Sequence, residues 1–278
     1  YLLVLVVCAF GFSGHLIAAE GPALKKTTSF TFADVETGQK ILTADDNYMN
    51  RMSPAEIAIR LGSSTPDKTA SDLKSRYWDN VLTWTEEEKN QIKALIASYQ
   101  AKLDTLSPFL PGEVTFIKVN DKVEGGLPHT RANAIVLPVS EKGLSDTLFF
   151  HELFHVLSRQ QKEKHPGLYS LIGFKACDFS GNAETNANSL TNPDVPAEGY
   201  YLPVEIEGKE SAVMTFLHAT KEAFDPAIKG GFGGHFGFGL LKVTVNNNQC
   251  TVDTDENGKA QILKPDSVPG FFAAIGLN

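Results

Sequence analysis

One pentapeptide in this sequence, His151-Glu152-Leu153-Phe154-His155, has residue types and a spacing that suit metal binding and water activation. In an α-helix, residues four apart lie on the same face, so both imidazoles can reach one tetrahedral zinc ion. Glu152 points about 100° away from His151, which places its carboxylate beside the ion. The spacing therefore predicts a Zn2+ site with His151 and His155 as ligands and Glu152 as the catalytic base.

The chemistry expected of such a site is the hydrolysis of an amide bond. Zinc lowers the pKa of a bound water from about 15.7 toward 7 and polarises the attacked carbonyl. Glu152 would accept a proton from that water and pass it to the leaving amine. The competing interpretation is that both histidines are structural. Burying two imidazoles and a carboxylate in an apolar helix is unfavourable unless they share a partner, which favours the metal.

The residues around the motif predict a buried helix that begins at a Ser145 or Asp146 cap and is limited by Pro166. Apolar residues cover most of its circumference, namely Leu148, Phe149, Phe150, Leu153, Phe154, Val156 and Leu157. Two strands are predicted before it, over Val114–Val119 and over Ala134–Leu137. We expect these strands to form a small sheet that packs on the helix.

The N-terminal half has a helical pattern from Pro54 to Leu106. Thr85 and Glu88 form a capping box, and apolar residues then recur at steps of three and four until Ser107-Pro108. Upstream, Ser29–Phe32 alternates weakly, which predicts an extended arm or a short edge strand. We expect an all-helical lobe in this half of the chain.

The segment from His151 to Arg159, His-Glu-Leu-Phe-His-Val-Leu-Ser-Arg, resembles the zincin metallopeptidases, and among them the gluzincin branch. The metzincin branch would need a glycine in place of Ser158 and a histidine in place of Gln161. The resemblance implies that the strand from Arg131 to Leu137 is an edge strand, which in zincins runs antiparallel to bound peptide.

Two further segments, Thr130–Ile135 and Leu190–Asp194, are similar to a group of uncharacterised secreted bacterial HExxH proteins. That similarity implies no known substrate, and in that group we expect a Glu-rich helix near the end of this chain. The last residues, Gly276-Leu277-Asn278, directly follow an apolar stretch from Phe271. We therefore expect the sequence to be cut before a helix that carries a zinc ligand.

The third zinc ligand is less clear than the first two. Gluzincins take a Glu from a helix downstream of the motif, and the sequence shows no clear helix of that kind. Glu184, in a stretch rich in Asn, Ser and Gly, and Asp194, after a proline, are candidates, although turn hydrogen bonding is the simpler role for each. Glu205 and Glu207 lie in a predicted strand, most simply on a solvated face. A Glu beyond Asn278 is the remaining alternative.

Four other side chains are weaker candidates for stabilising the oxyanion that forms at the attacked carbonyl: Tyr200, Tyr201, His218 and His235. For the two histidines, surface or turn roles are the simpler interpretation. The stretch Gly230–Gly239 lacks the ending of a phosphate loop. We expect it to be a flexible loop, forming a cleft wall or lid, before a strand at Leu240–Val245.

Residues 1–19 predict an export signal, because they carry no charge, include an apolar run and end in small residues before Glu20. Signal removal leaves Cys177 and Cys250, which are compatible with one disulfide in an oxidising compartment or with two buried thiols. We expect a secreted, periplasmic or extracellular protein without stable membrane insertion after signal removal.

Together these observations predict an α+β fold with a helical N-terminal lobe and a zincin-like core, in which a small sheet packs on the HExxH helix. The predicted domains are a signal peptide at 1–19, an arm and helical lobe at 20–110, and a catalytic region at 111–278. The chain has a net charge of -8 and no basic stripe that could neutralise phosphates, which argues against a nucleic-acid partner. The predicted function is a secreted zinc metallopeptidase acting on peptide or protein. The alternatives are a non-catalytic zinc-binding or partner-binding module, and an amidase acting on cell-wall peptide.

Overall fold

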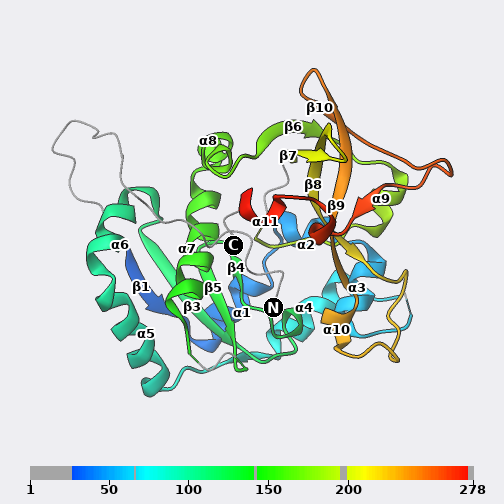
Figure 1. The fold of residues 1–278 in the computed structure, drawn as a ribbon. Coiled ribbons are helices and arrows are strands. Elements are labelled where there is room, and N and C mark those ends of the chain that lie inside the picture. Colours follow the sequence, from blue (N-terminus) through cyan, green and yellow to red (C-terminus); the bar gives the residue numbers. More distant parts are fainter. Residues whose placement is uncertain (1–26, 66, 141–142, 195–198, 275–278) are drawn as a thin grey trace. The chain divides into compact units, whose positions relative to one another are not determined.

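A computed structural model describes residues 27–65, 67–140, 143–194 and 199–274 (Figure 1). The predicted signal peptide at 1–19 and the C-terminal residues 275–278 lie outside the described residues. The chain divides into two compact units, unit 1 with Tyr1–Leu42 and Asn80–Lys162, and unit 2 with Thr43–Asp79 and Glu163–Asn278. Each unit contains both helices and strands, so the α+β prediction is confirmed.

Unit 1 contains the pentapeptide. Its strands are β1 (Ser29–Phe32), β2 (Val81–Leu82), β3 (Glu113–Val119), β4 (His129–Arg131) and β5 (Ala134–Pro138). Its helices are α1 (Val35–Leu42), α5 (Glu86–Ser98), α6 (Gln100–Leu106) and α7 (Asp146–Gln160), with short 3-10 turns at Ser107–Phe109 and Glu124–Gly126. The three strands and the buried helix that the sequence predicts are therefore present.

The five-stranded sheet of unit 1 has the order β1-β3-β5-β4, and β2 pairs with β3 outside this path. Strands β1, β3 and β5 are parallel to one another. Strand β4 is antiparallel to β5 and joins it through a turn at Ala132 and Asn133. The last strand in the order is therefore β4.

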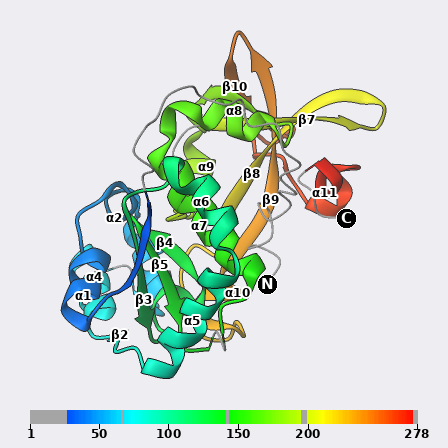
Figure 2. The ribbon, with the colours of Figure 1, turned by 90° about the vertical axis from the view of Figure 1, so that its left-hand side faces the viewer.

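The sheet of unit 1 is covered on both faces (Figure 2). On one face Val114 and Phe116 join the apolar cluster that includes residues of α5, α6 and α7. Ile117 alternates to the other face, where α1 lies. A Cβ added to Gly38 of α1 would stand 2.8 Å from Val81 Cγ1 and 3.1 Å from Ile117 Cγ2. The missing side chain at Gly38 therefore lets α1 lie directly on the sheet.

Helix α5 begins at the predicted capping box. Thr85 Oγ1 accepts a hydrogen bond from Glu88 N over 3.2 Å, and a Glu88 carboxylate oxygen accepts one from Thr85 N over 2.8 Å. The predicted single helix is interrupted at Tyr99, whose φ of -114° and ψ of 15° end α5 and precede α6. The helical segment then ends in the 3-10 turn at Ser107–Phe109, as expected from Pro108.

Unit 2 has strands β6 (Lys175–Phe179), β7 (Gly199–Ile206), β8 (Lys209–Ala219), β9 (Phe236–Asn246), β10 (Gln249–Val252) and β11 (Ile262–Leu263). Its helices are α2 (Asn47–Arg51), α3 (Pro54–Leu61), α4 (Ala70–Trp78), α8 (His165–Ser170), α9 (Ala183–Asn188), α10 (Gly231–Gly234) and α11 (Phe271–Ala274). Short 3-10 turns occupy Lys162–Lys164, where the two units meet in sequence, and Pro265–Ser267.

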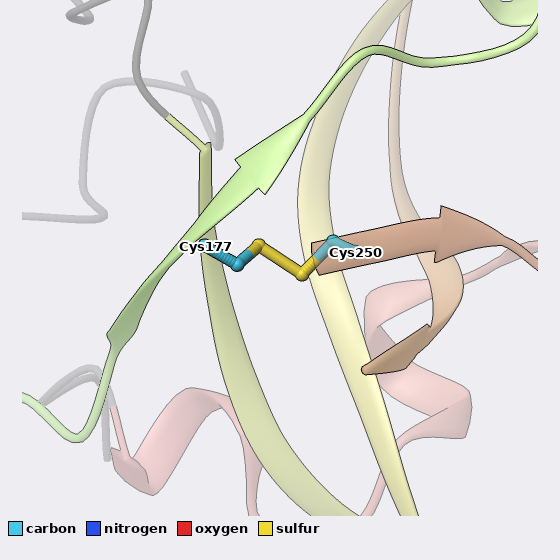
Figure 3. The surroundings of a disulfide bond; sticks show 2 residues. All are labelled: Cys177 and Cys250. Carbon is cyan, nitrogen blue, oxygen red and sulfur yellow. A yellow bond between two sulfur atoms is a disulfide. The ribbon is translucent and has the colours of Figure 1, made fainter. Parts of the chain in front are cut away.

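The strands of unit 2 pair in the order β10-β6-β7-β8-β9-β11, and β10 also pairs with β9. The pairing therefore closes on itself through β10, whose contact with β6 is parallel. The disulfide between Cys177 of β6 and Cys250 of β10 joins this parallel pair (Figure 3). Both cysteines belong to an apolar cluster with side chains of β8 and β9. Of the two alternatives that the sequence left open, a disulfide or two buried thiols, the structure has the disulfide.

The predicted helical lobe is wrong, because the helices between Pro54 and Leu106 belong to different units. A buried ion pair on α3, Glu56 with Arg60, bonds to Thr191 of unit 2, which ties α3 to that unit. Ile92 of α5 instead belongs to the apolar cluster of unit 1. The unit limits also differ from the predicted domain boundary at residue 110.

No helix in the part of the chain that the structure describes is long and apolar enough to cross a membrane.

Candidate functional site

Helix α7 positions the pentapeptide. It begins at Ser145, whose Oγ accepts a hydrogen bond from Leu148 N over 3.2 Å, so the first of the two predicted caps is the one used. It ends at Gln160, with Gln161 as the C-cap, well before Pro166. The predicted start of the helix is therefore confirmed, whereas Pro166 lies in the first turn of α8 and does not end α7.

The helix is buried on two sides. Phe149, Leu153 and Val156 form the stripe that packs in the apolar cluster of unit 1. Residues two positions apart in a helix are separated by about 200°, so His151 and His155 face away from Phe149 and Leu153. They are nevertheless also buried, because the exposed fractions of His151 and His155 are 6% and 5%. The imidazoles therefore occupy a second, polar interior face of α7.

The two imidazoles converge on one point. Their Nε2 atoms lie 3.1 Å apart, and their ring centroids are 4.6 Å apart at an interplanar angle of 82°. Glu152, between them in sequence, has an exposed fraction of 1%. The structure thus brings His151 and His155 into contact, and it buries Glu152 on the same helix.

The distance between the two nitrogens tests whether this pair suits zinc. With Zn–N bonds of 2.0 to 2.1 Å and tetrahedral angles, two nitrogen ligands stand about 3.3 Å apart. The observed 3.1 Å is close to that value, so both Nε2 atoms could share one ion after only a small rotation of either ring. Imidazole nitrogen is also a donor type that zinc prefers. The geometry of His151 and His155 is therefore suitable for two of the ligands of a zinc ion.

A third ligand is not evident. Among residues 27–65, 67–140, 143–194 and 199–274, no group of three or more His, Cys, Asp or Glu side chains could hold a metal ion. Glu184 lies in a short helix, α9, rather than in the predicted loop, because Asn182 and Thr185 form a capping box there. Its Oε2 accepts a hydrogen bond from Ala260 N over 2.7 Å.

The other acidic candidates have ordinary local roles. Asp194 lies in a turn, where its backbone N donates to Asn192 Oδ1 over 2.8 Å, as the sequence predicts for this kind of segment. Glu205 lies in β7 and Glu207 in the tight turn after it, at a φ of 53°. Both side chains are exposed, in agreement with the predicted solvated face.

The predicted edge strand is wrong in its position. The strand before the helix, β5, is paired on both sides, with β3 and with β4. The turn at Ala132 and Asn133 folds His129–Arg131 back onto β5, so β4 takes the outer position in the sheet. The turn signal in the sequence is weak at this point, because Asn133 favours turns but Ala132, the residue with the positive φ, does not.

The two other histidines considered from the sequence have structural contacts in unit 2. His235 is fully buried, its Nε2 accepts a hydrogen bond from Asp225 N over 2.8 Å, and its Nδ1 therefore carries the proton donated to Gly231 O over 2.7 Å. His218 is half-buried and stacks on Phe216 at 5.6 Å between ring centroids. Of the surface or turn roles that the sequence favoured, His235 does not have the surface one, because it is buried and bonds backbone groups of the nearby residues Asp225 and Gly231.

The glycine-rich stretch is largely not a loop. Strand β9 begins at Phe236, four residues earlier than predicted, and only Gly231–Gly234 forms a separate helical turn. A Cβ on Gly237 would come within 2.3 Å of the His218 ring, and one on Gly239 within 2.4 Å of Ile262 Cγ2. These glycines therefore serve close packing between strands rather than flexibility.

The tyrosine candidates also lie in unit 2. Tyr200 and Tyr201 belong to β7, and the ring of Tyr200 packs against that of Tyr169 at 4.5 Å between centroids. This contact does not bear on the oxyanion role suggested by the sequence, which stays a prediction for both tyrosines.

Comparisons with known proteins add no relative. No family model matches the chain, and searches of the curated proteins and of the solved structures gave no match.

Proposed function

We propose that the protein is a zinc-dependent metallopeptidase in which His151 and His155 hold the ion and Glu152 is the general base. The observation that carries the proposal is the 3.1 Å separation of the two Nε2 atoms on a buried helix face. Two convergent imidazoles with an adjacent carboxylate are the minimum set that this chemistry needs from one helix.

Each residue has a separate task in the proposed reaction. His151 and His155 bind the ion through Nε2, which requires that both rings be neutral. A bound zinc ion supplies Lewis acidity, which activates water and polarises the carbonyl. Glu152 takes the proton from the attacking water and later delivers it to the leaving amine. The burial of Glu152 keeps bulk water from competing for that proton.

The fold of unit 1 supports a zincin-like core. A small, mostly parallel sheet with one antiparallel outer strand precedes α7 in the chain, and the apolar face of α7 packs in the cluster that covers this sheet. In the resemblance to zincins, an outer strand of this kind runs antiparallel to bound peptide. In this chain β4, rather than β5, is the strand in the outer position, and its three residues are buried.

We further propose that the protein acts outside the cytoplasm. The buried disulfide between Cys177 and Cys250 is a feature of proteins that fold in an oxidising compartment. The uncharged apolar segment at 1–19 supports export as well. The predicted substrate is a peptide or protein in that compartment.

The proposal is tested with the full chain, measuring bound zinc by elemental analysis and cleavage of a mixed-peptide library. The wild type is expected to hold one zinc ion and to cleave. Glu152→Gln keeps both ligands, so it should hold zinc but lose cleavage by several orders of magnitude, while His155→Ala should lose the ion. Glu210→Gln, which changes an exposed carboxylate of β8 outside the motif, is the matched control and should behave as the wild type.

The candidates for the third ligand are tested in the same way. Glu184→Gln and Asp194→Asn each remove one carboxylate, and loss of zinc from either would identify the ligand. Zinc binding that survives both changes would exclude Glu184 and Asp194 as the required third ligand. A wild type without zinc, or cleavage that is indifferent to Glu152→Gln, would reject the proposal in favour of a binding module. Cleavage confined to cell-wall peptide would make the enzyme an amidase of that class.

A further inference from the structure

The chain between β10 and β11 leaves the edge of β9 and returns to it. Both strands pair with β9, and Asp253 N donates to Lys242 O over 2.9 Å at the point where the chain departs. Thr254 and Ala260 then pair in an isolated bridge that closes a separate hairpin. Residues 254–259, which form the tip of this hairpin, are all exposed. The tip is therefore a small exposed turn that projects from the sheet of unit 2.

The tip contains the only Asn-Gly step in the sequence, Asn257-Gly258. The side-chain amide carbon of an asparagine can be attacked by the main-chain nitrogen of the next residue. Glycine favours this attack, because it has no side chain in the way and allows the backbone rotation that the attack requires. Gly258 has a φ of 77°, and a Cβ added to it would meet nothing within 4 Å. Both residues are exposed, so water reaches them and neighbouring side chains do not restrict the rotation.

The hydrogen bonds of the tip oppose the attack without preventing it. Gly258 N donates to Asp255 O over 3.0 Å, so this nitrogen must leave the carbonyl before it can react. Asn257 N donates to Asp255 Oδ1 over 2.8 Å. All of these atoms belong to exposed residues, and local opening is easiest where backbone hydrogen bonds are exposed to solvent. The reaction should therefore be slower in the folded chain than in a free peptide of the same sequence.

We propose that Asn257 is a site of spontaneous deamidation, which converts it to aspartate or isoaspartate. Gly258 N forms a bond to Cγ of Asn257 and gives up its proton, and the side-chain amide nitrogen takes up that proton and leaves as ammonia. Water then opens the resulting five-membered imide. Opening at Cγ gives aspartate, and opening at the main-chain carbonyl carbon gives isoaspartate. Either product adds one negative charge, and neither depends on the proposed peptidase function.

The isoaspartate product should disrupt the tip, because it lengthens the main chain by one carbon at Asn257. Asp255 Oδ1 accepts hydrogen bonds from Asn257 N and also from Lys259 N, the latter over 2.9 Å, so it requires the ordinary spacing between these two amides. The bond from Lys259 N is the largest reason why the pKa of Asp255 lies below 3.8. Loss of this bond should return the pKa of Asp255 toward 3.8. The pairing of Asp253 with Lys242 lies outside the tip and should persist.

The test follows deamidation in the full chain at neutral and at mildly alkaline pH, by peptide mapping with mass spectrometry. Asn247 and Asn248 are the internal control, because they form an exposed turn between β9 and β10 but are followed by Asn248 and Gln249 rather than by glycine. Asn257→Gln is the control variant, since attack on its longer side chain must form a six-membered ring, which is slower. Asn257→Asp supplies the added charge without the longer main chain.

The wild type is expected to deamidate at Asn257, faster at the higher pH because the attacking nitrogen must lose its proton, while Asn247 and Asn248 stay intact. Asn257→Gln should stay unmodified at this position. The isoaspartate form, separated by chromatography, should exchange faster at the Lys259 amide, whereas fresh Asn257→Asp should exchange as the wild type does. An intact Asn257, or equal modification at Asn247 and Asn248, would overturn the proposed site. Unchanged exchange at Lys259 in the isoaspartate form would overturn the proposed effect on the tip.

Discussion

The hydroxyl of Tyr99 donates a hydrogen bond to Asp146 Oδ2 over 2.8 Å, which joins the end of α5 to the first turn of α7. This hydrogen bond is the largest reason why the pKa of Asp146 lies below its ordinary value of 3.8, with a further contribution from the Thr147 backbone. The same bond raises the pKa of Tyr99. The start of α7 is therefore held by a contact that favours the ionised carboxylate.

Tyr99→Phe removes this hydrogen bond and should lower the stability of the native state at neutral pH, but much less in acid. A carboxyl whose pKa is lowered by folding stabilises the native state above its unfolded pKa, here 3.8, and that stabilisation is lost as the pH falls through the lower folded value. The melting temperature of the variant should thus lie below that of the wild type at pH 7, and the difference should shrink below pH 3.8. NMR titration should show the Asp146 pKa returning toward 3.8 in the variant. A difference in melting temperature that does not change with pH would contradict this account.

The buried pair on α3 should be sensitive to the loss of either partner. Glu56 Oε1 accepts hydrogen bonds from Arg60 over 2.7 Å and from Thr191 Oγ1 over 2.6 Å, and both charged side chains are 2% exposed. Arg60→Met would leave the carboxylate buried without its charge partner, which typically costs about 3 to 5 kcal/mol of unfolding free energy. The double variant Glu56→Leu with Arg60→Met should lose less than the sum of the two single changes.

Denaturant unfolding of these variants measures the effect, and a second pair at the same helical spacing is the control. Lys40 and Glu36 also form an ion pair four residues apart, but their side chains are 68% and 71% exposed. Lys40→Met should therefore change stability little, since solvent screens the exposed pair. Equal losses in Lys40→Met and Arg60→Met would show that burial is not what makes the α3 pair important.

The disulfide should contribute stability to unit 2 by restricting its unfolded chain. Cys177 and Cys250 are 73 residues apart, and closing a loop of that length is worth about 4 kcal/mol in the chain-entropy estimate. The double variant Cys177→Ala with Cys250→Ala should lower the unfolding free energy by a similar amount. Mass spectrometry of the unreduced wild type should show the bridged peptide. A double variant as stable as the oxidised wild type would mean that the reduced chain is already restricted.

The features that the sequence predicted correctly are those that depend on residues close together in the chain. The Thr85 capping box, the Ser145 cap and the strands at Val114–Val119 and Ala134–Leu137 all depend on neighbours in the chain, and all are present. The contact between His151 and His155 could also be predicted, because it follows from helical geometry alone.

The errors concern contacts that are distant in sequence. The helices α3 and α5 have similar sequence patterns, yet α3 is bonded to Thr191 of unit 2 and α5 packs in the apolar cluster of unit 1. The sequence of neither helix indicates which partner it packs against. The outer position of β4 depends on a turn in which Ala132 has a positive φ. Alanine gives no such signal, because this conformation is typical of Gly or Asn.

The glycine-rich stretch Gly230–Gly239 allows a direct test of whether tertiary packing, rather than local composition, determines its structure. Glycines suggested flexibility, but Gly237 lies in β9 beside the ring of His218, where an added Cβ would come within 2.3 Å of the ring. Gly237→Ala should thus force apart β8 and β9 and cost about 1 to 3 kcal/mol of unfolding free energy. Gly233→Ala, where an added Cβ would meet nothing within 4 Å, is the matched control and should be nearly neutral. Adding His218→Ala to Gly237→Ala should restore part of the loss, since it removes the ring that the methyl group strikes. If the Gly237 and Gly233 variants unfold at the same denaturant concentration as the wild type, the stretch is flexible, as its composition alone suggests.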